Sequence, residues 1–465
     1  MERNIFLSVS PLDHRYYASN EALFNELSEY FSENAYIRYE LKVEAALARV
    51  LAKRGLCSQA VAGEIAEACG RVEPEEVYLE EERTKHNIRA LVNCIQRRVS
   101  EAARPYVHFT TTSVDIMDSA TAMRFKEATE KVVLPKMIEL ETLLIAIARR
   151  EKDTLQVGRT HGQHAVPITF GFAMAEYVSR FGSRVEAVKE TATNLRGKIA
   201  GAVGAYNASS LFFDDPMEFE AEVLWELGLK PSIYSNQIVE PEYLADYIHA
   251  IIAAFGVLAN LADDIRHLQR TEIGEVGETF EATQVGSSTM PHKRNPWNFE
   301  HVKSMWKEFM PRMITLYADQ ISEHQRDLTN SASGRFVPEI VVGFVAAVDR
   351  LTRVLKKLVV DEERMLRNFE STKEMVIAEP LYILLASLGH PDAHEAVRQL
   401  TMESQRSGKT LRELLVLKTE LFPYWDQLTP KQREVLENPE KYTGIAAQKT
   451  EYLCNLWEKR LFGIV

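Results

Sequence analysis

The feature that most constrains the fold of this sequence is a set of three long apolar seams at helical spacing. Within residues 134–147, 243–268 and 341–358, apolar side chains recur at steps of three and four, which places them on one face of a helix. Seams of this length favour an antiparallel helix bundle over alternating strands and helices. Their members are Leu134, Met137, Leu140, Leu144 and Ile147; Leu244, Ile248, Ile251, Phe255, Leu258, Ala262 and Ile265; and Val341, Phe344, Val348, Leu351, Leu355 and Leu358.

The same periodicity extends over most of the chain, whereas alternating strand patterns with Asn-Gly or Asp-Gly turns are scarce. We therefore expect an all-α fold. A length of 465 residues exceeds the usual size of one hydrophobic core. Breaks at residues 389–391, Pro423 and Pro430 indicate shorter helical segments near the C-terminus. We predict an N-terminal helical domain at 1–113, a central helix bundle at 114–361 and a C-terminal helical domain at 362–465.

Composition limits the environment and the partners. The net charge of −12 argues against a nucleic-acid-binding surface, which needs a cationic stripe. The first residues lack the apolar core of a signal peptide, and no uninterrupted apolar run reaches about 18 residues. The four cysteines show no paired metal-ligand spacing. We expect a soluble cytoplasmic protein with reduced thiols, no metal and no contact with a membrane.

A long loop interrupts the helical pattern at residues 270–300. Loops of this size in compact domains are functional or are solvated connections, and composition alone leaves both open. Residues 286–296 read Gly-Ser-Ser-Thr-Met-Pro-His-Lys-Arg-Asn-Pro. Two adjacent hydroxyls beside a glycine, followed by a Lys-Arg pair and an Asn, would let amides and cations converge on an anion.

This eleven-residue segment resembles the signature loop of the fumarase/aspartase superfamily, whose members eliminate fumarate from a substituted succinate. His292 distinguishes it from fumarases and aspartases, which have Gly or Ala there, and from argininosuccinate lyases, which have Gln. The Met-Pro-His-Lys-Arg-Asn-Pro form resembles adenylosuccinate lyases and also carboxymuconate cycloisomerases. Further segments resemble the adenylosuccinate lyase family, in family order and over essentially the whole chain: 10–16, 84–87, 107–115, 158–167, 197–204, 235–238 and 325–331.

The resemblance implies a three-domain fumarase/aspartase-like fold. Its central bundle would be shared in a homotetramer, with each active site built from three subunits. The implied reaction is β-elimination of fumarate from adenylosuccinate to give AMP, in purine nucleotide biosynthesis and without a cofactor. Use of the second family substrate, succinylaminoimidazole carboxamide ribotide, stays open. The alternatives are another superfamily member, such as an argininosuccinate lyase or a carboxymuconate cycloisomerase, and an inactive structural helix-bundle protein.

Such an elimination needs a base for the carbon proton, an acid for the leaving nitrogen and cations for the developing carboxylate charge. By resemblance the base is Ser287, with Ser288 as the rival assignment, and the loop must lower the pKa of the serine. His161 matches the general acid. His86 matches a histidine close to the substrate, although Asn87 replaces the usual Asp of that motif. For His164 we expect a structural role.

The resemblance also implies residues that bind the substrate. Lys293, Asn295, Thr112 and Ser113 match positions for the succinyl carboxylate; helix capping by the hydroxyls and a solvated lysine are the ordinary alternatives. Guanidinium groups suit the phosphate because they bind it bidentately. Two departures, His301 in place of an arginine and residues 240–242 in place of an Arg-Asp pair, leave individual contacts open. The other matched residues are Arg15, Tyr16, Lys85, Asn87, Gln237, Ser288, Arg326, Ser331 and Arg335.

Overall fold

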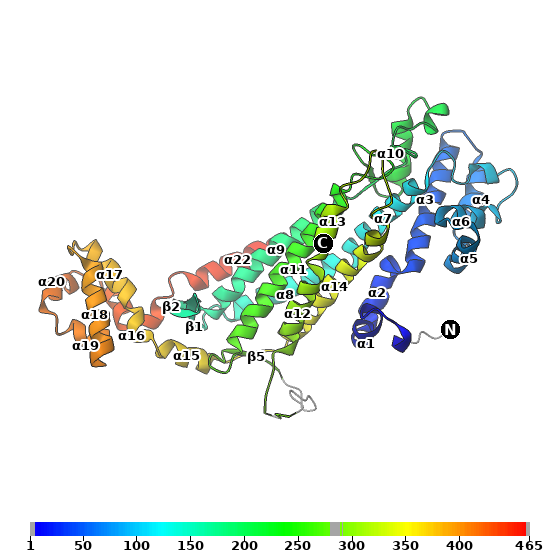
Figure 1. The fold of residues 1–465 in the computed structure, drawn as a ribbon. Helices are drawn as coiled ribbons and strands as arrows, with labels where there is room; N and C mark the ends of the chain where they lie inside the picture. Colours follow the sequence, from blue (N-terminus) through cyan, green and yellow to red (C-terminus); the bar gives the residue numbers. More distant parts are fainter. Residues whose placement is uncertain (1–4, 280–288, 291, 462–465) are drawn as a thin grey trace. The chain divides into compact units, whose positions relative to one another are not determined.

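The computed structural model describes residues 5–279, 289–290 and 292–461, and this part of the chain is predominantly helical (Figure 1). Strands occur in the described residues as three two-stranded sheets. The all-α prediction is therefore confirmed, with short strands added to it. Ser287 and Ser288 lie outside the described residues.

The chain divides into two compact units. One comprises residues 1–138, 184–256 and 304–349, and the other comprises residues 139–183, 257–303 and 350–465. All five boundaries fall inside long helices, so both units share these elements. The division into three domains stays a prediction. The shared helices are α8 (Leu134–Arg150), α9 (Phe170–Thr193), α11 (Glu242–Leu268), α12 (Trp297–Phe309) and α14 (Ser331–Leu355).

The first unit also contains shorter helices with clear start signals. The side chains of Ser32 and Ser58 accept hydrogen bonds from the first turns of α3 and α4, which satisfies backbone donors that a helix start leaves unpaired. Its elements are η2 (Leu12–Tyr16), α1 (Tyr17–Ser19), α2 (Glu21–Phe31), α3 (Glu33–Lys53), α4 (Gln59–Cys69), α5 (Pro74–Thr84), α6 (Asn87–Gln96), α7 (Ser113–Ala128), α10 (Pro216–Glu226), α13 (Arg312–Ala318) and the strands β3 (Arg196–Gly197) and β4 (Lys230–Pro231).

The second unit holds two antiparallel strand pairs and the C-terminal helices. Strands β1 (Leu155–Thr160) and β2 (Gln163–Thr169) form a hairpin, and β5 (Val276–Glu278) pairs with β6 (Leu358–Val360). The helices are α15 (Glu362–Glu370), α16 (Lys373–Val376), α17 (Ala378–Ser387), α18 (Ala393–Ser407), α19 (Leu411–Leu415), α20 (Phe422–Trp425), α21 (Pro430–Glu437) and α22 (Ala446–Leu461).

The three predicted seams lie in the long helices and are almost entirely buried. In α11, the seam residues from Ile248 to Ile265 are at most 1% exposed. One seam residue was placed wrongly, because Leu358 belongs to β6 after α14 has ended. Helices α11 and α14 are long and apolar enough to cross a membrane, but the apolar residues of the α11 seam pack into protein, as those of a core helix do.

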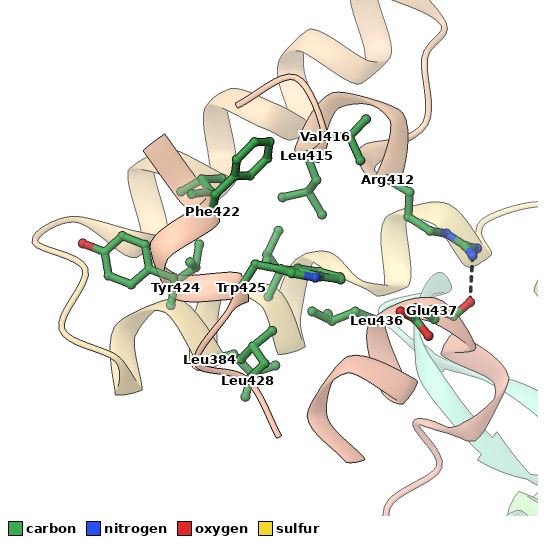
Figure 2. A pocket seen from close by; sticks show the side chains of 13 residues that line it. Leu384, Arg412, Leu415, Val416, Phe422, Tyr424, Trp425, Leu428, Leu436 and Glu437 are labelled. Atoms are coloured by element: carbon green, nitrogen blue, oxygen red, sulfur yellow. Dashed lines mark hydrogen bonds between the residues drawn. The ribbon is translucent and has the colours of Figure 1, made fainter. Parts of the chain in front are cut away.

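The C-terminal helices α17 to α21 enclose a separate apolar cluster with a cavity of 270 Å³ (Figure 2). Leucines and the aromatic side chains of Phe422, Tyr424 and Trp425 line it. At one end, the Arg412 guanidinium donates to the Glu374 carboxylate and to the main-chain oxygen of Glu437. The lining contains none of the predicted site residues and no acid–base pair suited to an elimination.

Candidate functional site

The predicted site residues are divided between the two units. The described members in the second unit are His161, Lys293 and Asn295. All the others with a described position lie in the first unit: Arg15, Tyr16, Lys85, His86, Asn87, Thr112, Ser113, Gln237, Arg326, Ser331 and Arg335.

The N-terminus of α7 connects several of the family-like segments within the first unit. Thr112 is the N-cap residue of α7, and its N–H donates to Asp115 Oδ2 at 2.8 Å in a capping box. The fully buried Asp115 carboxylate pairs with Lys198 and accepts hydrogen bonds from the N–H groups of Ala200 and Gly201. Segments 107–115 and 197–204 are therefore held together. The capping interpretation holds for Thr112, whereas Ser113 is the first residue of the helix.

One turn along α7, Asp118 contacts a further segment, which in turn contacts another. Its Oδ2 accepts from the N–H of Val239 at 2.8 Å, and the N–H of Gln237 donates to the main-chain oxygen of Gln325 at 3.2 Å. Desolvation raises the pKa of Asp118 to about 6, although the Val239 bond and the charges of Lys198 and Arg326 oppose the rise. Segments 235–239 and 325–326 thus meet beside α7.

Arg326 is held in an uncommon backbone conformation, with a φ of 137°. Its Nη2 is buried and has no hydrogen-bond partner among the described residues. A buried guanidinium nitrogen without an acceptor is costly, so it suits a position that an anionic ligand completes. Ser331 and Arg335 begin α14 five and nine residues later; both are exposed, and Arg335 Nη1 donates to the Ser331 carbonyl at 2.9 Å.

Residues 85–87 reach the same region from α5 and α6. Lys85 ends α5 in the left-handed conformation, with a φ of 54°. His86 caps α6, where its Nδ1 accepts from the N–H of Arg89 at 3.2 Å, so the ring proton resides on Nε2 in the neutral form. Asn87 Nδ2 donates to Met117 Sδ, on α7, at 3.5 Å. Lys85 and His86 are both exposed.

The structure adds a histidine that the sequence interpretation did not select. His108 has a φ of 61°, and both its N–H, at 3.1 Å, and its ring Nδ1, at 2.6 Å, contact the Glu44 carboxylate. Desolvation lowers the pKa of His108, but the charge and hydrogen bond of Glu44 outweigh it, so this pKa lies above its usual value. The available signal was Glu44, a carboxylate set among the apolar residues Val43, Ala45, Ala46 and Leu47, where a charged side chain is seldom buried without a partner.

Arg15 and Tyr16 lie away from this region. Asn20, four residues after Tyr16, donates to Asp349 Oδ2 at 2.7 Å, and Lys136 pairs with the same carboxyl group at 3.6 Å. Residues 113–150 are continuously helical, so Lys136 stands about 35 Å along the helix from the start of α7. One copy of the chain does not bring Arg15 and Tyr16 to the N-terminus of α7.

In the second unit, His161 occupies the tip of the β1–β2 hairpin. His161 and Gly162 form the two-residue turn with φ values of 54° and 73°, as a type I′ turn requires. The hairpin is anchored by Glu275, which is fully buried and accepts from Arg159 at 2.5 and 3.1 Å. Gln156 and Asn368 each donate to the same carboxylate at 2.8 Å. The His161 side chain is exposed above this rigid base.

Lys293 and Asn295 follow the part of the loop that lies outside the described residues. The Lys293 N–H donates to the Met290 carbonyl at 3.0 Å, and its side chain is exposed. His164 contacts Thr372 Oγ1 through its Nδ1 at 3.0 Å, an arrangement that suits a structural role. His301, on α12, is half-buried, and desolvation together with the Arg350 charge lowers its pKa. Within the described ranges, no three His, Cys, Asp or Glu side chains are grouped to hold a metal ion.

Comparison with known proteins decides the family. Residues 14–310 match a family model described as Lyase, and residues 322–432 match one described as Adenylosuccinate lyase C-terminal. The adenylosuccinate lyase of Pyrococcus abyssi is 36% identical over 459 residues, which cover 97% of this chain and 99% of that protein. The adenylosuccinate lyase of Methanocaldococcus jannaschii is 34% identical over 95% of this chain and 94% of its own length. The chain belongs to the adenylosuccinate lyase family.

Solved structures place this family member within the wider superfamily fold. The 3-carboxy-cis,cis-muconate lactonizing enzyme from Pseudomonas putida superposes with a TM-score of 0.80 at 26% identity, covering 95% of this chain and 99% of the other. The resemblance drawn from the signature loop and the other segments is therefore confirmed at the level of family and fold. The adenylosuccinate lyase relatives favour that family over the cycloisomerase alternative.

Proposed function

We propose that this protein cleaves adenylosuccinate to AMP and fumarate by β-elimination. The supporting observation is the N-terminus of α7, where Asp115 and Asp118 tie together segments that resemble the family's substrate-binding motifs. Full-length similarity to adenylosuccinate lyases supplies the substrate class. In the reaction a base removes a proton from the carbon beside a carboxylate, the neighbouring carbon–nitrogen bond breaks, and an acid protonates the nitrogen.

In this proposal Ser287 is the base and His161 is the acid. The exposed position of His161 at the tip of an anchored hairpin supports its role, because a proton donor must reach the substrate without losing its orientation. Lys293 and Asn295 bind the succinyl carboxylate and stabilise the charge that develops there. Thr112 and Ser113 contribute donors to the same end of the substrate, and His86 orients it.

Arg326, Arg335 and Ser331 hold the nucleotide phosphate, with Gln237 beside them. The unpartnered, buried Nη2 of Arg326 supports this assignment, because an anion would supply the missing acceptor. Arg15 and Tyr16 complete the nucleotide site from another copy of the chain, since their own copy keeps them distant from α7. We propose that the copies assemble as a homotetramer with shared sites, and that this assembly works in the cytoplasm without a metal.

Exposed apolar side chains near the ends of α13 and α14 agree with such an assembly. Ile314, Ile321 and Phe336 are 70%, 80% and 56% exposed. Apolar surface of this kind would be covered by a second copy of the chain.

A direct assay tests the proposal. Purified protein is incubated with adenylosuccinate, and AMP and fumarate are quantified by chromatography; equal amounts of both products are expected. Argininosuccinate and carboxymuconate, tested in parallel, distinguish the other superfamily activities, and succinylaminoimidazole carboxamide ribotide tests the second family substrate. Loss of turnover in Ser287→Ala but not in Ser288→Ala would identify the base. Inactivity of a verified tetramer on every substrate would leave the structural-protein alternative.

Shared sites have their own test. Inactive His161→Ala and Ser287→Ala proteins are mixed under conditions that exchange subunits. If the two residues of one site come from different copies, some reconstituted sites are wild type and part of the activity returns. No recovery after subunit exchange, verified by mass spectrometry, would contradict sharing between these two residues.

A further inference from the structure

Glu44 is a buried carboxylate whose two oxygens both contact His108. It lies on the inner face of α3, is 1% exposed and faces one residue with both of its oxygens. Oε2 accepts from the His108 N–H at 3.1 Å, and Oε1 contacts the His108 ring at Nδ1 at 2.6 Å. Because a carboxylate accepts but does not donate, Nδ1 must carry a proton.

This contact determines what His108 can offer to a ligand. The side chain is 19% exposed, and its Nε2 makes no hydrogen bond among the described residues. Thr111 Oγ1 donates to the His108 carbonyl at 3.1 Å and secures the turn that leads directly to Thr112 and Ser113. One ring nitrogen is thus fixed inside the protein, and the other remains available.

We propose that Glu44 is a positioning residue, whose buried negative charge holds His108 as an imidazolium that donates from Nε2 to an anionic group of the substrate. The inference rests on the proposed function for the identity of that substrate. A neutral ring protonated on Nδ1 would present a lone pair at Nε2 and would repel a carboxylate or phosphate.

The charges around the ring support this assignment. Desolvation lowers the pKa of His108, and Arg89 from α6 acts in the same direction. Glu44 from α3 and Asp115 from α7 raise it and prevail.

Glu40, one turn before Glu44, has its pKa raised to about 8 by burial, so at neutral pH it is largely uncharged. Cys69 from α4 also faces Glu44, and its pKa is raised by burial and by that charge. Glu44 is therefore the negatively charged group nearest to the His108 ring.

The decisive variant is Glu44→Gln, with Glu40→Gln as the matched control. Both glutamates are buried on α3, but only Glu44 contacts segment 107–115 among the described residues. Glutamine can still accept from Nδ1–H but supplies no charge, so His108 becomes neutral at a lower pH. We expect KM for adenylosuccinate to rise about tenfold or more at pH 7, where Glu40 is largely uncharged, with kcat changed much less. The increase should shrink towards pH 6, where the ring is protonated again, and Glu40→Gln should show neither effect.

A KM increase of equal size at every pH, or an equal one in Glu40→Gln, would overturn the inference. Glu44→Asp keeps the charge and should retain most of the wild-type pH profile, which separates the electrostatic effect from general damage to α3. Loss of KM sensitivity to Glu44→Gln in a His108→Gln background is also expected, because the two residues act as one unit.

A readout without turnover separates this inference from the proposed function. Titration of the His108 ring by NMR in protein with labelled histidines should show a lower pKa in Glu44→Gln than in the wild type, with or without substrate. An unchanged titration would refute the pairing even in an active enzyme. If the titration shifts as expected but adenylosuccinate is not cleaved, the proposed function fails and the role of Glu44 in holding the charge of His108 stands.

Discussion

Two buried glutamates anchor two histidine-bearing segments in different ways. In one unit, Glu44 contacts the His108 ring itself. In the other, Glu275 binds Arg159, Gln156 and Asn368, and the His161 ring lies two residues beyond the anchored arginine. Both histidines have left-handed backbones, with φ values of 61° and 54°. The direct contact fixes the protonation of a ring, whereas the indirect contact fixes only where the ring is carried.

That difference corresponds to two chemical roles, anion binding and general acid catalysis. A group that binds an anion should keep its proton throughout the cycle, and a buried carboxylate at Nδ1 achieves this. A general acid must give its proton away and regain it, so a permanent carboxylate contact would hinder it. The His161 ring makes no hydrogen bond to a carboxylate within the part of the chain that the structure describes. The anchoring at a distance through Glu275 suits the proposed acid.

The largest effect on the kinetics should come from replacing each of the two histidines, in separate variants, with glutamine. His161→Gln removes the proton donor, so we expect kcat to fall about 10²- to 10⁴-fold with little change in KM. His108→Gln should instead raise KM, with a smaller loss of kcat. Steady-state kinetics with adenylosuccinate measures both. Equal kcat losses in the two variants would remove the functional distinction between the histidines.

Removing the distant anchor should chiefly affect stability. Glu275→Gln leaves the Arg159 guanidinium, whose side chain is 15% exposed, without its partner charge. Breaking a buried pair in this way costs about 3–5 kcal/mol, which urea unfolding would detect. Glu272→Gln, three residues earlier and exposed, is the control and should change stability by less than about 0.5 kcal/mol. Equal unfolding midpoints for the two variants would show that Glu275 is not an anchor.

A third buried glutamate sharpens the comparison because it anchors nothing. Both oxygens of Glu141, on α8, are buried and lack a partner among the described residues, and burial raises its pKa well above the usual value. Because the pKa of Glu141 is higher in the folded than in the unfolded state, protonation of this group favours the folded state. This contribution is complete below the unfolded pKa of about 4.3 and is lost as the pH rises through the folded pKa. Glu141→Met should therefore stabilise the fold at pH 7 by about 1–3 kcal/mol.

The gain from Glu141→Met should be smaller at pH 4 than at pH 7, and thermal unfolding at both values measures it. Glu44→Met is the contrasting substitution: it should destabilise, because it removes the acceptor of two hydrogen bonds. Stabilisation by both substitutions would mean that the Glu44 contacts contribute nothing to the fold.

The smallest expected effect concerns the capping box that follows the His108 turn. Thr112→Ala should cost about 1 kcal/mol of stability by removing the cap of α7 and, if Thr112 also binds substrate, should raise KM. Thr410→Ala removes a capping box of the same kind at α19 and is the matched control. Unfolding free energies should fall similarly in both. An unchanged KM in Thr112→Ala would restrict this threonine to its structural role.

The sequence predicted the bundle because its signal is local. Residues such as Ile248, Phe255 and Leu258 are spaced by the helix itself, and their burial follows from that spacing. The sequence did not predict the β1–β2 hairpin, because its turn is His161-Gly162 rather than the usual Asn-Gly and therefore gives no turn signal. Motif resemblance nevertheless selected His161, the residue at its tip.

Long-range contacts could not be derived in the same way. Glu44 and His108 are 64 residues apart, and no periodicity links them. The separation of Arg15 and Tyr16 from α7 likewise depends on how Asn20, Lys136 and Asp349 meet in three dimensions. Sequence motifs named Arg15 and Tyr16 but neither Glu44 nor His108 as site residues, and the grouping of all four required the fold.

The five helices that pass from one compact unit into the other also bear on how the chain loses its structure. Neither unit can be excised by cutting at a linker, because every boundary interrupts a hydrogen-bonded helix. If the part of α11 in one unit unfolded, the part in the other unit would begin at a new, unpaired helix end and would be less stable. The two units are therefore coupled as one cooperative folding block, and a protein divided at residue 256 or 349 would yield two incomplete fragments rather than two independent domains.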